Sequence, residues 1–252
     1  MARRKPVHRD AGAYFSRAAA SFKAGRYEEA AADLTRAIGL DPQNAVYYLR
    51  RGACREAAGD LDGAVEDYGS AIALAPGEAG IYDLRAACLR KAGRYRQAVN
   101  DSTFAVTLDP TNAGYYSGRA AGFHLAGKYE EAIADLDRAL VLEPGNTDHL
   151  FARAVCLHAD GRFAEAVRDL DGVLAAQPAA APALSLRGSC LYRSGDFAGA
   201  LADFNRAVEL DPENAALYAF RAECFAALGR EEEAGADRKR AERLEAGPEE
   251  EG

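Results

Sequence analysis

The sequence contains no long run of apolar residues and none of the short motifs that commonly mark a catalytic centre. No stretch approaches the roughly 18 apolar residues of a membrane-spanning helix. The N-terminal stretch MARRKPVHRD is basic and lacks the apolar segment of a secretory signal. The patterns HExxH, CxxC and GxSxG are absent. We therefore expect no membrane contact, no catalytic metal, no cofactor and no enzymatic activity.

Positive charge is also scarce relative to negative charge. The chain has 31 Lys and Arg residues against 39 Asp and Glu residues, which gives a net charge of -8 at pH 7. A general nucleic-acid binder carries an excess of positive charge on its binding face. The composition therefore argues against nucleic acid as the principal partner and is typical of a soluble protein.

What the sequence does have is a unit of 34 residues that recurs seven times. Its clearest copy is AGYYSGRAAGFHLAGKYEEAIADLDRALVLEPGN, residues 113–146. Tyr116, Ala120 and Phe123 follow one another at three- and four-residue steps, which predicts a first helix. The apolar residues between Ala132 and Leu140 keep the same spacing and predict a second one. Each unit is therefore expected to be a helical hairpin.

Glycine, proline and asparagine punctuate the units at fixed places. A Gly follows each first helix, where a left-handed residue would end the helix and a Cβ would clash. These glycines are Gly25, Gly59, Gly93, Gly127, Gly161, Gly195 and Gly229. A Pro, which cannot continue a helix, closes six units: Pro42, Pro76, Pro110, Pro144, Pro178 and Pro212. Four asparagines are placed to cap the next first helix: Asn44, Asn112, Asn146 and Asn214.

These residues resemble the tetratricopeptide repeat family over about residues 11–248. The family pattern has a bulky residue at position 4, small residues at positions 8 and 20, Gly-x-aromatic at 15 to 17, Ala at 27 and Pro at 32. Position 20 is Ala in every unit here: Ala30, Ala64, Ala98, Ala132, Ala166, Ala200 and Ala234. The resemblance implies an all-α fold, a right-handed α-solenoid of seven helix-turn-helix repeats.

The predicted organisation is one array with a short segment at each end. Residues 1–10 are expected to be a disordered basic lead-in, with an electrostatic contact as the alternative. The repeats span 11–44, 45–78, 79–112, 113–146, 147–180, 181–214 and 215–246. The last repeat has Glu231 and Arg238 where most others are apolar, as a terminal, solvent-facing cap requires. Residues 247–252 are expected to be an acidic tail.

The five cysteines all occupy the tenth place of their repeats. Equivalent residues of adjacent stacked helices lie on the order of 10 Å apart, too far for a disulfide. We expect free, buried thiols, which suit a reducing compartment such as the cytoplasm. The same spacing prevents His124 and His158 from sharing a metal ion. These residues are Cys54, Cys88, Cys156, Cys190 and Cys224.

Two further places in the repeat carry matched charges. Position 7 is Arg and position 23 is Asp in all seven units, for example Arg119 and Asp135. Because Arg binds a carboxylate in a planar, bidentate way, we expect each Asp to hold an Arg between helices. The alternative is a ladder of arginines that reads acidic ligands.

The family resemblance also implies a binding surface. In the family, positions 2, 5, 9, 12 and 13 of the first helix line a concave groove that binds peptide segments of other proteins. Three Phe, one Tyr and several cations predict a ligand with apolar side chains and some acidity; any single member is alternatively an ordinary surface residue. The larger residues at these places are Phe15, Phe22, Lys23, Leu49, Glu56, Asp83, Arg90, Lys91, His124, Leu125, Phe151, His158, Tyr192 and Arg193.

One subset of the family clamps the C-terminal carboxylate of heat-shock chaperones with Lys, Asn and Arg at defined places. No unit here has the required Lys at position 5 and Asn at position 9, and Arg50 at position 6 is the nearest approach. The sequence therefore argues against carboxylate-clamp binding of chaperones.

The function predicted from these features is a non-catalytic scaffold or adaptor that holds partner proteins in its groove. The alternatives are a regulatory subunit that docks to a catalytic partner, and nucleic-acid binding through Arg90, Lys91 and Arg193, which a steep salt dependence would reveal. A stand-alone enzyme would need a coupled acid and base in the groove. Exposed apolar surfaces of such arrays also self-associate in some cases, so a dimer stays open.

Overall fold

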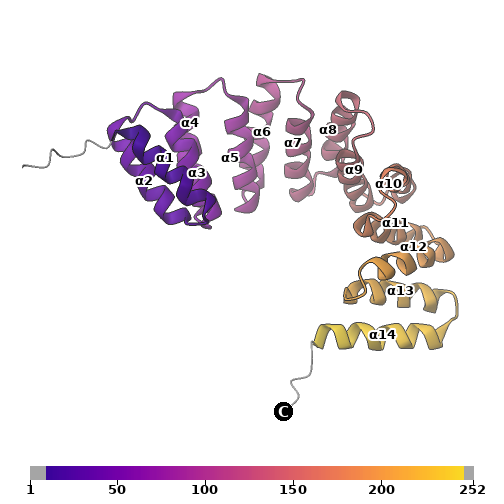
Figure 1. Ribbon diagram of the computed structural model, residues 1–252. Coiled ribbons are helices and arrows are strands. Elements are labelled where there is room, and N and C mark those ends of the chain that lie inside the picture. The colour runs from indigo at the N-terminus through magenta and orange to yellow at the C-terminus, as the bar shows by residue number, and fades with distance from the viewer. Residues whose placement is uncertain (1–9, 247–252) are drawn as a thin grey trace, which may run out of the picture. The chain divides into compact units, whose positions relative to one another are not determined.

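The structure is a computed structural model that describes residues 10–246, and in that range it consists of helices and connecting turns without a strand (Figure 1). The predicted lead-in and tail lie outside the described residues, except for Asp10. Its carboxylate accepts a hydrogen bond from the Ala13 N–H at 2.7 Å and caps the first helix. The helices are α1 (Ala11–Lys23), α2 (Tyr27–Leu40), α3 (Ala45–Ala57), α4 (Leu61–Leu74), α5 (Ala79–Lys91), α6 (Tyr95–Leu108), α7 (Ala113–Leu125), α8 (Tyr129–Leu142), α9 (Thr147–Ala159), α10 (Phe163–Ala176), α11 (Ala181–Arg193), α12 (Phe197–Leu210), α13 (Ala215–Ala227) and α14 (Glu231–Ala246).

The helices belong to two compact units, the first ending at Gly127 and the second beginning at Lys128. The first unit holds α1 to α7, and the second holds α8 to α14. Within each unit, every helix packs against the one before it and the one after it in the chain. The all-α hairpin architecture predicted from the repeat is therefore confirmed.

Each hairpin turns on a glycine in the left-handed region. The seven predicted glycines have φ between 72° and 88°, and Gly145 adds an eighth at 77°. At the first-unit turn around Gly93, the N–H of Arg94 donates to the Leu89 carbonyl at 2.9 Å, which closes the end of α5. The expectation that these glycines end the first helices in a left-handed conformation is confirmed.

We expect alanine substitutions at two glycines of the last hairpin to change stability in opposite directions. Gly229 has φ of 74°, so Gly229→Ala should lower the free energy of unfolding by about 1 kcal/mol. Gly235 lies inside α14 with open space where a Cβ would stand, so Gly235→Ala should raise it by up to about 1 kcal/mol. Urea titration followed by circular dichroism measures both changes. Shifts of the same sign would contradict this account of the turn.

Three of the four predicted asparagine caps are present. The side-chain oxygens of Asn44, Asn112 and Asn146 accept hydrogen bonds from backbone N–H groups two residues ahead. Asn214 makes no such cap, and its amide instead donates to Asp211 at 3.1 Å. The prediction of a side-chain cap at Asn214 was therefore wrong, and nothing in the structure explains the difference, because the amides of Asn44 and Asn146 also donate to the carboxylate three residues before them.

The core runs along the hairpins and depends on small residues at positions 8 and 20. The position-20 alanine is fully buried in every repeat. The side chain at position 24 packs against the residue at position 8, and a larger residue at position 24 goes with a smaller one at position 8. Where position 24 is aromatic, at Tyr68 and Phe204, position 8 is Gly52 or Gly188. A Cβ at Gly52 would lie 2.8 Å from the Tyr68 ring, and one at Gly188 would lie 3.0 Å from Phe204. The ring therefore requires the glycine.

The last described helix is polar, as the sequence predicts for a cap. Only Ala234, Asp237 and Ala241 of α14 are buried. Glu231 and Arg238, the two departures from the repeat pattern, are both exposed. A polar outer face lets the terminal hairpin meet water.

Candidate functional site

Paired arginine and aspartate side chains join the two helices of six hairpins. In each pair the guanidinium Nε and Nη2 donate to the two carboxylate oxygens of the Asp sixteen residues later, and the Asp is buried. The predicted Arg–Asp partnership is confirmed for these six hairpins, while Arg119 and Asp135 belong to different units. The pairs are Arg17–Asp33, Arg51–Asp67, Arg85–Asp101, Arg153–Asp169, Arg187–Asp203 and Arg221–Asp237.

The same arginines also reach back to the preceding hairpin. Arg153 and Arg187 donate through Nη1 to Asp137 and Asp171, each at 2.6 Å. Arg51 reaches the Thr35 hydroxyl at 3.1 Å in the same register. In these hairpins the guanidinium is thus divided between the Asp of its own hairpin and position 25 of the hairpin before it, and Arg221 does the same with Asn205 at 3.2 Å. This arrangement favours a structural role over a ladder that reads acidic ligands.

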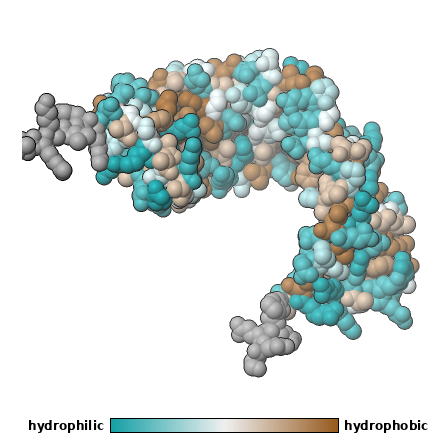
Figure 2. Space-filling view, viewed as in Figure 1, coloured by the Kyte–Doolittle hydropathy of each residue, from teal (hydrophilic) through white to brown (hydrophobic). Residues whose placement is uncertain are grey.

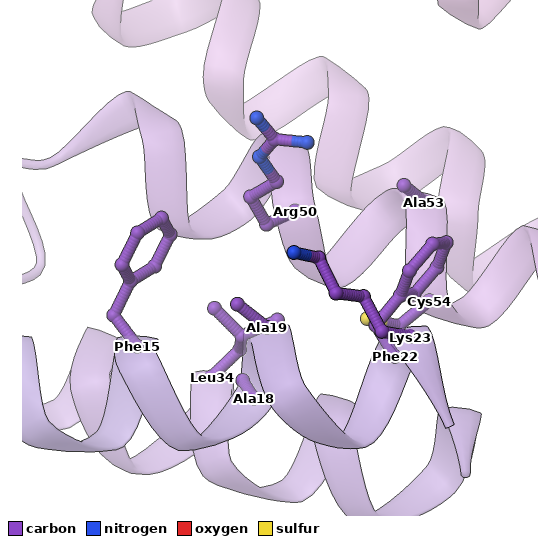
Figure 3. Close-up of a pocket in the computed structure, with 9 residues that line it drawn as sticks. All are labelled: Phe15, Ala18, Ala19, Phe22, Lys23, Leu34, Arg50, Ala53 and Cys54. Atoms are coloured by element: carbon purple, nitrogen blue, oxygen red, sulfur yellow. The ribbon is translucent and has the colours of Figure 1, made fainter. Parts of the chain in front are cut away.

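At the N-terminal end of the first unit, α1, α2 and α3 enclose an apolar pocket of about 290 Å³. Phe15 and Phe22 stand on opposite sides of it, Lys23 reaches into the space between the rings, and the Arg50 guanidinium lies above that space (Figure 3). On the visible face of this end of the unit, apolar residues are interspersed with hydrophilic ones (Figure 2). The remaining lining residues are Ala18, Ala19, Leu34, Ala53 and Cys54.

The two cations at this pocket have no polar partner among the residues that the structure describes. Neither Lys23 nor Arg50 forms an ion pair or side-chain hydrogen bond with another residue of the described range, and both are exposed. Phe22 is 39% exposed and touches Tyr27 edge-on, with ring centroids 5.3 Å apart. Phe15 is half-buried against Tyr47. The pocket therefore combines an apolar floor with two available positive charges.

Further along the first unit, the predicted groove residues Glu56 and Lys91 bind each other. The Lys91 ammonium lies 2.7 Å from Glu56, and the Tyr68 hydroxyl donates to the same carboxylate at 2.8 Å. Burial and this hydrogen bond raise the pKa of Tyr68, so its hydroxyl stays a donor. Leu49 is half-buried and packs against the cluster around Tyr68. These side chains serve to pack the hairpins.

Asp83 and Arg90 form a second polar group of the first unit, on α5. Burial raises the pKa of the Asp83 carboxyl, and the nearby Arg90 charge partly offsets this. Burial lowers the pKa of Arg90, which donates to the Gly118 carbonyl at 3.0 Å. A Cβ at Gly118 would lie 2.9 Å from Asp83, so the glycine permits this approach of α7 to α5. His124 is half-buried and Leu125 is exposed.

In the second unit, Phe151 lines a wide depression of about 470 Å³ formed by α9, α11 and α13. His158 lies 3.0 Å from the Ser189 hydroxyl, and burial together with the Arg193 charge lowers its pKa. Arg193 stacks over the ring of Phe163 at 5.0 Å. The polar groups of this unit are therefore largely turned to internal contacts.

Among the lining residues outside the predicted groove set are two large side chains at one place in the repeat. Arg50 lines the first pocket, and Phe220 lines the wide depression of the second unit, where it is 41% exposed. Both occupy position 6, which the family-based selection of positions leaves out. An unpaired cation or exposed aromatic ring at that position is the signal that would have revealed them.

The five cysteines are free and buried, as predicted. Burial raises the pKa of each thiol to about 11. Among residues 10–246, no group of three or more His, Cys, Asp or Glu side chains is arranged to hold a metal ion. None of the helices in this range combines the length and apolar character that crossing a membrane requires.

The hairpins, their glycine turns and their small-residue core define a helical repeat protein of the α-solenoid class. The sequence pattern of the tetratricopeptide repeat matches residues 15–79, 84–147, 125–181, 159–215 and 186–250, and the chain belongs to that family. No curated protein matches the chain in sequence.

Solved structures of tetratricopeptide repeat proteins share the fold. A protein of this type from Parabacteroides merdae is similar with a TM-score of 0.75 at 21% identity, over 96% of this chain and 94% of that one. PilF of Pseudomonas aeruginosa gives 0.68 at 20% identity, over 84% and 97%. YrrB, described as a protein with an unusual peptide-binding site, gives 0.60 at 20% identity, over 73% and 95%.

Proposed function

We propose that this protein is a non-catalytic scaffold or adaptor that binds peptide segments of other proteins along the first helices of its hairpins. The apolar pocket of about 290 Å³ between α1 and α3 is the observation that carries the proposal. A concave, mainly apolar site with a few placed polar groups is the usual form of a ligand site. Aromatic anchors beside Arg are the usual composition of a binding hot spot.

The family and the structural neighbours support the same function. Tetratricopeptide repeats are generally interaction modules without catalytic groups, and YrrB has a peptide-binding site. In this chain six of the position-7 arginines are already bound to aspartates, so they are not free to act on a substrate. The residues we propose for the binding surface are the first-helix residues predicted from the sequence, with Arg50 and Phe220 added.

A capture experiment with two variants tests this function. The intact protein should retain specific proteins from a lysate, and a groove variant should lose them while its helical circular dichroism is unchanged. A matched control removes exposed apolar side chains of the second helices instead and should retain them. The groove variant is Phe22→Ser, Arg90→Ser, Phe151→Ser and Tyr192→Ser; the control is Leu40→Ser, Phe104→Ser, Val141→Ser and Leu210→Ser.

Equal retention by the groove variant and the intact protein would contradict the proposal. Loss in the control alone would move the binding surface to the second helices. If a captured protein is an enzyme whose rate changes when the array binds, the regulatory-subunit alternative applies.

A further inference from the structure

The pocket at the N-terminal end of the first unit differs from the equivalent space elsewhere in the repeat. It lies between position 12 of one hairpin, here Phe22, and position 6 of the next, here Arg50, with position 24, here Leu34, as its floor. Every pair of consecutive hairpins within a unit offers the same space. What fills that space decides which of them can receive a ligand.

In the other hairpin pairs of the first unit, the protein's own side chains cross this space. Between the second and third hairpins the floor residue is Tyr68, a fully buried ring that reaches Glu56. Between the third and fourth, Arg90 crosses to the Gly118 carbonyl at 3.0 Å. Both spaces are thus occupied by a bonded side chain.

In the second unit the protein's own side chains also reduce these spaces. Between the fifth and sixth hairpins, His158 lies 3.0 Å from the Ser189 hydroxyl. Between the sixth and seventh, Phe204 and Phe220 stack with centroids 5.6 Å apart, and about 150 Å³ remains. The first pocket stays open because Leu34 is shorter than an aromatic residue and Ala19 and Ala53 are small.

The volume and charge of the open pocket identify the chemistry of its occupant. An apolar cavity of about 150 Å³ is enough for benzene, so about 290 Å³ has room for a Phe, Leu or Met side chain. Lys23 and Arg50 place two unpaired positive charges at its mouth. These two cations attract an acidic group of a ligand. The chain as a whole carries a net charge of -8, which repels acidic groups, so the attraction is confined to this place.

We propose that this pocket is the principal anchoring subsite of the protein. The pocket takes a bulky apolar side chain of an extended partner segment, and an Asp or Glu next to that residue in the partner binds Lys23 and Arg50. The inference rests on the proposed function and adds the anchor and its specificity. An acidic side chain fits better than a chain terminus. The family's clamp for a terminal carboxylate needs Lys at position 5 and Asn at position 9, and these places are Phe15 and Ala19 in the first hairpin and Leu49 and Ala53 in the second.

Selection from a random-peptide display library tests the anchor. On the intact protein, enriched peptides should carry a large apolar residue next to Asp or Glu. Ala53→Leu fills the pocket, and Lys23→Glu with Arg50→Glu reverses its charge. Each change should lower the affinity for an enriched synthetic peptide by at least about tenfold, as expected at a hot spot, and fluorescence polarisation measures this affinity. Arg96→Glu, an exposed charge on α6, is the matched control and should leave binding unchanged.

The same measurement separates the two proposals. Peptides that bind the intact protein and both pocket variants equally, but not the four-residue groove variant, would overturn the anchor and leave the proposed function standing. No enrichment on the intact protein would overturn both. Peptides that lose affinity on C-terminal amidation, but not on replacement of Asp or Glu by Asn or Gln, would show a terminal carboxylate and overturn the acidic side chain.

Discussion

Replacing Arg187 by leucine should lower the free energy of unfolding by about 3 kcal/mol. Arg187 holds the buried carboxylate of Asp203 with two hydrogen bonds of 2.7 and 2.8 Å. Removing one partner of a buried ion pair costs about 3–5 kcal/mol, because the other charge stays in the interior without compensation. Urea titration followed by circular dichroism, with the midpoint and slope compared to the unchanged protein, measures the loss.

The other bond of the same arginine supplies the control. Arg187 also binds Asp171 at 2.6 Å, but the Asp171 side chain is 55% exposed. Exposed pairs contribute up to about 1 kcal/mol, so Asp171→Ala should cost far less than Arg187→Leu. A double-mutant cycle should give strong coupling between Arg187 and Asp203 and weak coupling between Arg187 and Asp171. Equal coupling would show that burial does not govern the strength of these pairs.

The second large effect is expected at Tyr68. Tyr68→Ala should lower the free energy of unfolding by about 4 kcal/mol, because it empties the space of a fully buried aromatic ring. Tyr68→Phe removes only the hydroxyl that donates to Glu56 and should cost about 1 kcal/mol. The same urea titration compares the two variants, and similar losses would mean that the hydroxyl, and not the ring, carries the stability.

Substitution of Gly52 tests whether the Tyr68 ring requires a glycine beside it. In the unchanged protein, Gly52→Ala should be destabilising, because the added Cβ would lie 2.8 Å from the Tyr68 ring. In the Tyr68→Ala background the clash is gone, and the better helix propensity of alanine should make the same substitution neutral or stabilising. A cost that is the same in both backgrounds would show that the ring does not require the glycine.

Much of the fold could be predicted because its signals are local and repeated. The left-handed turn at Gly93 follows from glycine alone, since other residues meet a steric penalty there. The pairing of Arg187 with Asp203 follows from matched charges at a constant separation of sixteen residues. The failure at Asn214 has no signal in the sequence, because Asn44, Asn112 and Asn146 hold the same place in the repeat and do form the cap.

The candidate site was only partly predictable. Phe15, Phe22 and Lys23 follow from their places in the repeat, but Arg50 does not, because position 6 is not one of the family's groove positions. Whether a repeat position is open depends on side chains from three helices at once. The sequence does not reveal that Glu56 and Lys91 neutralise each other, whereas the structure brings them to 2.7 Å.

The sequence by itself therefore determined the helices, their turns, the repeat and the family, because each depends on a few neighbouring residues and recurs along the chain. Only the tertiary structure decided which of the equivalent spaces between hairpins stays open. Tyr68 fills one of them from below, and the stacked rings of Phe204 and Phe220 narrow another to about 150 Å³. Leu34 leaves one of about 290 Å³ open beside Lys23 and Arg50. The reason is that the volume left between two hairpins, and the charge left unpaired there, depend on side chains from several helices. Only packing brings those side chains together.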